Sequence, residues 1–185
     1  MKSKFSLTIP RERVGVLIGR KGKVKEHLER ILNVSLEVDS SSGIVNVEGL
    51  DSNPINIWRA RDVILAIGRG FSPEKAFKLL SSDEYLLEVI DLRSILGRSE
   101  NAIKRVKGRV IGREGKTRRI IEEIADVDVS VYGHTISIIG GYESIIIARE
   151  AIKMLIEGKT HATVYRFLSN KRRELKKRSK TKLWE

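Results

Sequence analysis

The sequence predicts an α+β protein made of two similar modules, each a three-stranded sheet covered on one face by helices. A short loop of the form Gly-x-x-Gly occurs twice, within residues 18–23 and again within residues 111–116. The segments around these loops, residues 15–38 and 108–131, align with each other without a gap. Both carry a helical pattern on each side of the loop and a valine-rich alternating strand after it. Repeats this far apart indicate a duplicated domain, because the repeats of a solenoid are shorter.

The first module begins with a strand and a helix. Residues Phe5–Ile9 place apolar side chains on one face, which predicts a short strand. Pro10 suits the first turn of a helix, where its missing N–H costs nothing. Val14, Leu17 and Ile18 form the apolar stripe of that helix and lead directly into the first loop.

A second amphipathic helix and two strands follow the first loop. The helix is predicted to end at Asn33, and its apolar positions recur at helical spacing: Val24, Leu28, Ile31 and Leu32. Val34–Val38 alternates strictly, which is typical of a half-buried strand. The turn residues Asp39–Gly43 then separate it from a second strand, Ile44–Val47.

Two further helices complete the first module. Pro54 opens the longer one, and Gly68 and Gly70 interrupt it. Ser72-Pro73-Glu74 then has the chemistry of a helix N-terminus, with a capping hydroxyl, a proline and an acid in the first turn. The side chains expected to face inward are Ile57, Ala60, Ile64 and Ile67 in the longer helix and Ala76, Phe77 and Leu80 in the shorter one.

The second module repeats this order with a longer N-terminal part. A strand over Tyr85–Leu92 precedes a helix over Ser99–Val106, which either runs on or bends into residues 109–111. After the second loop the pattern predicts a helix, strands at Val127–Val131 and Thr135–Ile139, a closing helix that ends at Gly158, and one more helix from Thr160 to about Lys177. The apolar stripes of these helices are Thr117, Ile120, Ile121 and Ile124, then Ile145, Ala148, Ile152 and Leu155, then Val164, Phe167, Leu168 and Leu175.

The predicted domain boundaries follow from this pass along the chain. Residues 1–80 form the first module with its appended helix, and residues 85–170 form the second with its own. The polar segment Ser81–Asp83 is the expected connection, and residues 171–185 form a basic helix end or tail. A chain of 185 residues is long enough to bury two modest cores of this kind.

Composition restricts the classes of function. The formal charge is +12 and the sequence pI is about 10.0, which predicts a polyanionic partner, although a generally basic proteome would give the same values. No cysteine is present, which excludes disulfides, thiolate metal sites and thiol nucleophiles, and the three histidines lack ligand spacing. We therefore expect no metal and no cofactor. No apolar run is as long as a membrane span and the N-terminus lacks a signal-peptide pattern, so a cytoplasmic protein is expected.

The loops themselves are suited to holding a phosphate. Glycines let the backbone adopt positive φ and approach another backbone closely. The N-terminus of the following helix offers N–H groups and a favourable dipole to an anion. Arg20, Lys21 and Lys23 add formal charge to the first loop, and Arg113 and Lys116 to the second. Glu114 replaces Lys21, so the second loop is less cationic.

The segments GVLIGRKG at residues 15–22 and GRVIGREG at residues 108–115, each between two helices, resemble the eukaryote-type KH domain. The resemblance covers residues 3–70 and 85–158 and implies that about four nucleotides of single-stranded RNA or DNA lie against each loop. The pair of modules, with residues 71–77 after the first and 163–166 after the second, resembles the KH proteins of archaeal ribosome assembly. That narrower resemblance implies binding near the 3′ end of small-subunit ribosomal RNA. It also implies contact with an rRNA-processing endonuclease or with the alpha subunit of initiation factor two.

The expected RNA-binding residues come from both loops and the groove floor beside them. In the first module they are Gly15, Ile18, Gly19, Arg20, Lys21, Gly22, Lys23 and Val24. In the second they are Gly108, Ile111, Gly112, Arg113, Glu114, Gly115, Lys116 and Thr117. The alternative for the apolar positions, which include Leu28 and Ile121, is ordinary core packing, and for the charged positions it is solvated loop charge.

The segment Lys171–Lys182 holds eight basic residues and one acid. Nonspecific contact with an RNA backbone and a solvated helix end are both consistent with it. The residues expected to make such contacts are Lys171, Arg172, Arg173, Lys176, Lys177 and Arg178.

Two other classes of function, an enzyme and a protein adaptor, compete with RNA binding. An enzyme is not expected, because the sequence shows no paired acids in an apolar context, no nucleophile elbow and no Walker-type phosphate loop. A protein adaptor remains an alternative, in which one module binds a translation or rRNA-processing factor and only the other module binds RNA.

Overall fold

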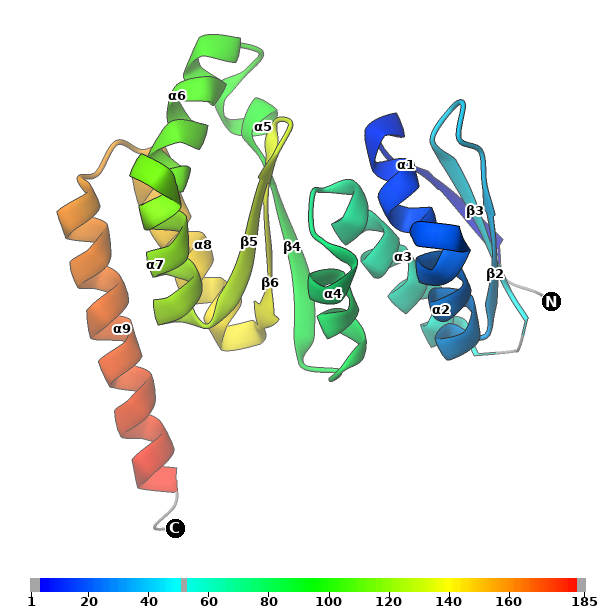
Figure 1. Ribbon diagram of the computed structural model, residues 1–185. Helices are drawn as coiled ribbons and strands as arrows, with labels where there is room; N and C mark the ends of the chain where they lie inside the picture. The colour runs from blue at the N-terminus through cyan, green and yellow to red at the C-terminus, as the bar shows by residue number, and fades with distance from the viewer. Residues whose placement is uncertain (1–3, 51–52, 183–185) are drawn as a thin grey trace. The chain divides into compact units, whose positions relative to one another are not determined.

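A computed structural model describes residues 4–50 and 53–182, with side chains described as far as residue 178. The chain separates into two compact units, Met1–Leu87 and Glu88–Glu185. The division falls within a strand, β4 (Tyr85–Asp91). Each unit contains one three-stranded antiparallel sheet with helices on one face (Figure 1), so the predicted α+β class is confirmed.

In the first unit the sheet has the order β1–β3–β2, with the predicted hairpin between its second and third strands in sequence. The register pairs Leu7 with Val45 and Leu36 with Val47. The elements in chain order are β1 (Lys4–Thr8), α1 (Arg11–Ile18), the 3₁₀ turn η1 (Arg20–Gly22), α2 (Lys23–Leu32), β2 (Val34–Val38), β3 (Ile44–Gly49), α3 (Pro54–Gly68), α4 (Pro73–Ala76) and the 3₁₀ turn η2 (Phe77–Leu80).

The core of the first unit lies between the sheet and α1, α2 and α3. Leu17, Leu28 and Ile64 are fully buried there. Ile31 is predicted to lie on the inner stripe of α2, but it is 49% exposed. The buried face of α2 is formed by Leu28 and Leu32, and Ile31 lies to one side of that face. The appended segment also differs in detail from the prediction. Leu79 is buried, whereas Phe77 and Leu80 are only partly buried.

The second unit repeats the sheet as β4–β6–β5. The predicted turn at residues 132–134 is a tight connection, since Tyr132 pairs with Thr135 across the hairpin. Its elements are β4, α5 (Leu92–Leu96), α6 (Glu100–Ile111), the 3₁₀ turn η3 (Arg113–Gly115), α7 (Lys116–Ala125), β5 (Val127–Tyr132), β6 (Thr135–Gly141), α8 (Tyr142–Ile156) and α9 (His161–Lys182). None of the helices in the described part of the chain is both long enough and apolar enough to cross a membrane.

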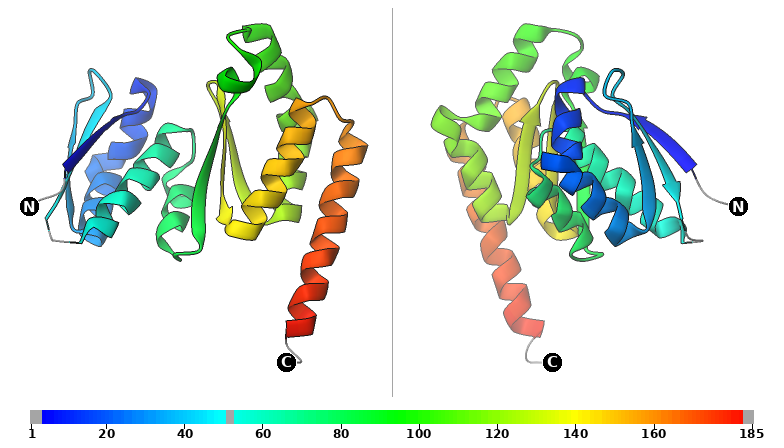
Figure 2. Two further views of the ribbon diagram at one scale, coloured as in Figure 1. Left: turned by 180° about the vertical axis from the view of Figure 1, so that it is seen from behind. Right: turned by 45° about the vertical axis from the view of Figure 1, so that its right-hand side comes forward.

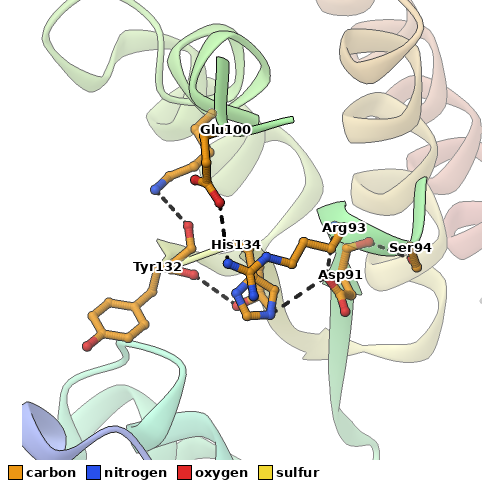
Figure 3. Close-up of polar contacts among 9 residues, drawn as sticks. Asp91, Arg93, Ser94, Glu100, Tyr132 and His134 are labelled. Atoms are coloured by element: carbon orange, nitrogen blue, oxygen red, sulfur yellow. Dashed lines mark hydrogen bonds and ion pairs between the residues drawn. The ribbon is translucent and has the colours of Figure 1, made fainter. Parts of the chain in front are cut away.

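The N-terminal part of the second unit contains a helix, α5, that the sequence patterns did not predict. Asp91 caps α5 by accepting from the N–H of Arg93 at 2.9 Å, and Arg93 reaches Glu100 at 3.4 Å. The N–H of Leu92 donates to the carbonyl of His134 at 2.9 Å, which ties α5 to the β5–β6 turn. Figure 3 shows these side chains converging from β4, α5, α6 and the turn. After α5, helix α6 runs without a bend to Ile111, so the helix predicted from Ser99 continues through residues 109–111.

An arginine on the helix before each loop caps the C-terminal end of the third main helix. Arg13 donates to the carbonyls of Ile67 at 2.8 Å and Phe71 at 2.6 Å. Arg109 donates to the carbonyl of Leu155 at 3.0 Å and to that of Lys159. The carbonyls of Ile67 and Leu155 also accept from the N–H groups of Gly70 and Gly158, so each arginine adds a second donor at the end of a helix and ties that end to the helix before the loop.

An appended helix packs behind the loop in both units. In the first unit the ring of Phe77 meets His27 of α2 edge-to-face, with 5.0 Å between ring centroids. In the second, α9 packs against α7 and α8 (Figure 2), and Val164 and Leu168 are fully buried as predicted. The hydroxyl of Tyr165 lies 2.8 Å from that of Thr117, at the start of α7. Both appended helices therefore support the helix that follows the loop.

Replacing Tyr165 with Phe should test how firmly α9 holds the second loop. The change leaves the Thr117 hydroxyl, which is only 2% exposed, without its partner, and an unsatisfied buried hydroxyl costs about 1–2 kcal/mol. The midpoint of urea unfolding, followed by circular dichroism, should fall accordingly. Tyr142→Phe is the matched control, because that tyrosine is 66% exposed and should be insensitive. Equal midpoints for the two variants would show that the Tyr165–Thr117 bond does not stabilise the unit.

Candidate nucleic-acid interface

The two Gly-x-x-Gly loops adopt the same backbone conformation. Gly19 has φ 74° and ψ 173°, and Gly112 has φ 71° and ψ 176°, a region that only glycine occupies without strain. The residues in the middle, Lys21 and Glu114, are both left-handed, with φ 56° and 51°. Two side chains of opposite charge thus occupy one backbone geometry. The loop conformation is set by the glycines and not by the charge between them.

The glycines around each loop fall into two kinds. A Cβ on Gly19 would lie 2.3 Å from Cγ2 of Val24, and one on Gly112 would lie 2.2 Å from Oγ1 of Thr117. These two positions require glycine for the fold itself. Gly15 and Gly108 differ, because they are exposed and a Cβ there would meet nothing within 4 Å. The fold does not demand glycine at these helical positions, although glycine costs helix stability.

The helix after each loop begins without a side-chain cap. Gly22 and Gly115 are the N-cap residues of α2 and α7, and within the described residues no side chain accepts from their first-turn N–H groups. The N–H groups of Lys23 and Lys116 donate to the carbonyls of Arg20 and Arg113, and the helix dipole favours an anion beside the first turn. Each loop therefore presents backbone donors together with the formal charges around it.

The formal charges are placed differently in the two loops. The exposed cations are Arg20, Lys21 and Lys23 in the first loop and Arg113 and Lys116 in the second. None of these five side chains forms an ion pair in the described part of the chain. In the second loop Arg119 of α7 donates to the carbonyl of Glu114 at 2.9 Å, which holds its guanidinium at the loop. Sequence reasoning missed Arg119. The ungapped alignment contained the signal, because it places Lys21 opposite Glu114 and Glu26 opposite Arg119.

The residues predicted to form the groove floor divide by burial. Ile18, Val24 and Ile111 are partly exposed beside the loops. Leu28 and Ile121 are fully buried, so the core-packing alternative holds for them. Thr117 is almost completely buried and bonded to Tyr165, so it supports the loop from beneath.

An edge strand lies beside the second helix in each unit. β2 and β5 are edge strands of their sheets and lie against α2 and α7. Glu29 accepts from the N–H of Leu36 at 2.7 Å, and Glu122 accepts from the N–H of Val129 at 2.9 Å. These bonds show that the outward N–H groups of the edge strands face the helices, and alternation puts those of residues two positions further along on the same side.

A fixed negative charge follows β2. The hydroxyls of Ser42 and Ser41 donate to the carboxylate of Asp39 at 2.5 and 2.7 Å, and these bonds hold the pKa of Asp39 well below its usual range. The turn between β2 and β3 therefore carries a negative charge at any ordinary pH. This charge lies at the C-terminal end of β2, and Val34 is at the other end of that strand.

The C-terminal basic residues lie further along α9 than Tyr165. Arg172, Arg173, Lys176, Lys177 and Arg178 are exposed, and Lys171 is partly exposed. Lys171 pairs with Glu174 at 2.8 Å within α9, which lowers the pKa of Glu174. These residues continue α9 beyond Tyr165, which contacts the start of α7, and they form a separate charged surface of the second unit.

Comparison with protein families gives two matches. Residues 86–173 match the family described as the eukaryotic type KH-domain, KH-domain type I, and residues 4–66 match the KH domain. The first of these matches includes most of α9, so the appended helix is part of what is shared.

Similar proteins are found among archaea and eukaryotes. A KH domain-containing protein of Methanocaldococcus jannaschii is 50% identical over 100% of this chain and 80% of its own length. The pre-rRNA-processing protein PNO1 of Coccidioides immitis is 30% identical over 76% of this chain, and the match covers 54% of its length.

Solved structures show the same arrangement within each unit. Dim2p from Pyrococcus horikoshii is 44% identical, with a TM-score of 0.84 over 91% of this chain and 99% of that chain. A chain in the a/eIF2alpha–aDim2p–rRNA complex from the same organism is 43% identical, with a TM-score of 0.87 over 94% and 96%.

The two kinds of glycine should respond oppositely to alanine. Gly108→Ala places a methyl in open space on a helix and should raise the free energy of unfolding by about 0.5–1 kcal/mol. Gly112→Ala should lower it by at least about 1–2 kcal/mol, since φ is positive and the methyl overlaps Thr117. Urea titration of both variants measures the difference. A destabilised Gly108→Ala would mean that this glycine is structural after all.

Proposed function

We propose, because this chain belongs to the KH-domain family that includes PNO1 and Dim2p, that it binds a single-stranded segment of small-subunit ribosomal RNA near its 3′ end. The step served is ribosome assembly or translation initiation. The observation that carries the proposal is the pair of loops with one backbone geometry, uncapped helix N-termini and unpaired exposed cations. The solved complex of a similar chain with rRNA and a/eIF2alpha supports the choice of ribosomal RNA.

Each loop would grip the phosphates of the RNA. The N–H groups of Lys23 and Lys116 are already donated to the carbonyls of Arg20 and Arg113. Further N–H groups in the first turns of α2 and α7 would donate to phosphate oxygens, and the helix dipole stabilises the negative charge. Arg20, Lys21 and Lys23 add cations around the first loop. Around the second, Arg113, Lys116 and the anchored Arg119 take this role, so that Arg119 replaces the cation lost at Glu114.

The exposed glycines would let the chain of nucleotides lie close to the helix before each loop. Gly15 and Gly108 give a bare stretch of backbone where any side chain would hold the RNA away. Ile18 and Ile111 lie on the same short helical segments and offer apolar surface to the bases. This explains why glycine is present at two positions where the fold does not need it.

The outward edges of β2 and β5 would bind the bases. Beyond Leu36 and Val129, whose N–H groups are taken by glutamates, the next outward backbone groups belong to Val38 and Val131. Such groups can pair with the edge of an unstacked base, which a duplex does not expose. RNA recognition here therefore requires a single strand.

One observation supports the alternative, in which one module binds a protein factor and only the other binds RNA: the two loops differ in charge. The second loop carries Glu114 where the first carries Lys21, and although Arg119 restores a cation there, the Glu114 carboxylate remains beside the site and repels phosphate. An rRNA-processing endonuclease and the alpha subunit of initiation factor two are the proposed partners. The second is supported by the a/eIF2alpha in the complex of the similar P. horikoshii chain.

Charge reversal at each loop tests the proposed function. Arg20→Asp with Lys21→Asp, and separately Arg113→Asp, should each weaken binding to a single-stranded RNA, because attraction for phosphate becomes repulsion. The wild type should bind the perfect duplex of the same sequence more weakly. Filter-binding titration measures both quantities, with Lys153→Asp, an exposed cation on α8, as the control.

The outcomes separate the two candidate functions. Loss of affinity in only one loop variant assigns RNA to that module and supports the adaptor alternative. Unchanged affinity in both, or tighter binding to the duplex, contradicts RNA recognition by the loops.

The basic run on α9 makes a separate prediction about salt. Arg172→Gln with Arg173→Gln should lower the slope of log affinity against log salt by roughly 0.7–1.4, since each phosphate neutralised on a single strand contributes about 0.7. The preference for one RNA sequence over another should not change. Arg98→Gln with Lys104→Gln removes two exposed cations from elsewhere in the second unit and should leave the slope nearly unchanged. Equal slopes in all three proteins would make the basic run a solvated helix end.

A further inference from the structure

A pocket of about 380 Å³ lies between the first turns of α8 and the distal part of α9. Its apolar lining comes from Tyr142 and Ile146 on α8 and from Phe167 and Leu175 on α9. Figure 2 shows α9 running alongside α8 and continuing beyond it. All the lining residues belong to the second unit, and none belongs to a loop.

These apolar residues of the pocket are exposed or only partly buried. Tyr142 is 66% exposed and Ile146 is 37% exposed, and they are one turn apart on the same face of α8. Phe167 and Leu175 are only partly buried, although Val164 and Leu168 on the same helix are fully buried. The packing of α9 on α8 is thus tight near His161 and opens towards the pocket.

The charges around the pocket are arranged unlike those of the rest of the chain. Glu143 and Glu150 line the α8 side, both are exposed, and neither forms an ion pair within the described residues. The neighbouring Arg149 is directed to Glu88, at 3.4 Å, and does not neutralise them. On the α9 side Lys171 is neutralised by Glu174 at 2.8 Å, which leaves Arg178. In a protein of formal charge +12, this is an apolar surface with an acidic wall.

We propose that this pocket binds a basic amphipathic helix of a partner protein. Apolar side chains at helical spacing would cover Tyr142, Ile146, Phe167 and Leu175, while lysines or arginines on one flank would pair with Glu143 and Glu150. RNA is disfavoured here, because its phosphates would lie against two unpaired carboxylates. On this proposal the chain binds RNA at the loops and a partner protein at the surface between α8 and α9. The second module can then bind RNA and a protein at the same time.

The probe for the experiment is a fluorescein-labelled amphipathic peptide of about eighteen residues, long enough to form a helix when bound, with leucines at helical spacing and lysines on the flanks. A second peptide carries glutamates in place of the lysines. Fluorescence anisotropy with the full chain should show tighter binding of the lysine peptide. Glu143→Lys with Glu150→Lys should weaken that binding by about tenfold.

Matched controls lie on the same unit. Glu157→Lys changes an exposed glutamate just after α8 that does not line the pocket, and it should leave peptide binding unchanged. Ile146→Ser should weaken peptide binding, whereas Ile95→Ser, at another exposed isoleucine on α5, should not. Single-stranded RNA affinity, measured in parallel, should be the same for Ile146→Ser, Ile95→Ser and the wild type, which carry equal net charge, so failure at the pocket is distinguishable from failure at the loops.

Several results would overturn the proposal. Equal binding of the two peptides, or equal effects of Glu157→Lys and the pocket reversals, would show that the acidic wall does not select the partner. Displacement of the peptide by single-stranded RNA would assign the surface to RNA. Light scattering that shows self-association, abolished by Ile146→Ser, would make a second copy of the chain the occupant.

Discussion

The turn between the first two helices of each module depends on a backbone conformation that only glycine adopts without strain. Gly19 and Gly112 supply it, and the space that a Cβ would need at each is filled by the first apolar or hydroxyl side chain of the next helix. That close approach sets where α2 and α7 begin, and neither helix has a side-chain cap. The anion-binding character of each loop is therefore a consequence of how tightly the chain turns, and the surrounding cations strengthen it.

The two modules reach the same structural result with different residues. Arg13 lies before the aligned segment of the first unit and Arg109 within that of the second, yet each donates to carbonyls at the end of the third main helix of its unit. Phe77 supports α2 through a ring contact with His27, whereas Tyr165 supports α7 through a hydroxyl bond to Thr117. Both modules keep the same two physical features although the residues differ. The end of the third main helix receives hydrogen-bond donors, and the helix after the loop packs against a neighbouring segment.

The charged side chains of this protein form two surfaces of different sign, one at the loops and one on α8. The cations at the loops are exposed and unpaired in the described residues, as a phosphate ligand requires. The exposed carboxylates Glu143 and Glu150 on α8 lie instead beside apolar side chains of α8 and α9. The net charge of +12 describes the whole chain but neither surface, because binding depends on the few groups within a Debye length of the ligand.

The sequence by itself determined the duplication, the order of helices and strands, and both loops, because hydrophobic period and glycine spacing are local properties of the chain. It also placed Asn33 at a helix end, which the left-handed backbone there confirms. The tertiary structure decided the exceptions among the side chains predicted to face inward. Ile31 has the right spacing for the core but is exposed, whereas Thr117, which the apolar stripe and the RNA-contact prediction both include, is buried and bonded to Tyr165. The position of α5 depends on a hydrogen bond to the distant His134, and Arg119 is held at the loop by the shape of the turn at Glu114. The pocket between α8 and α9 depends on how two helices diverge, which no pattern within either helix contains.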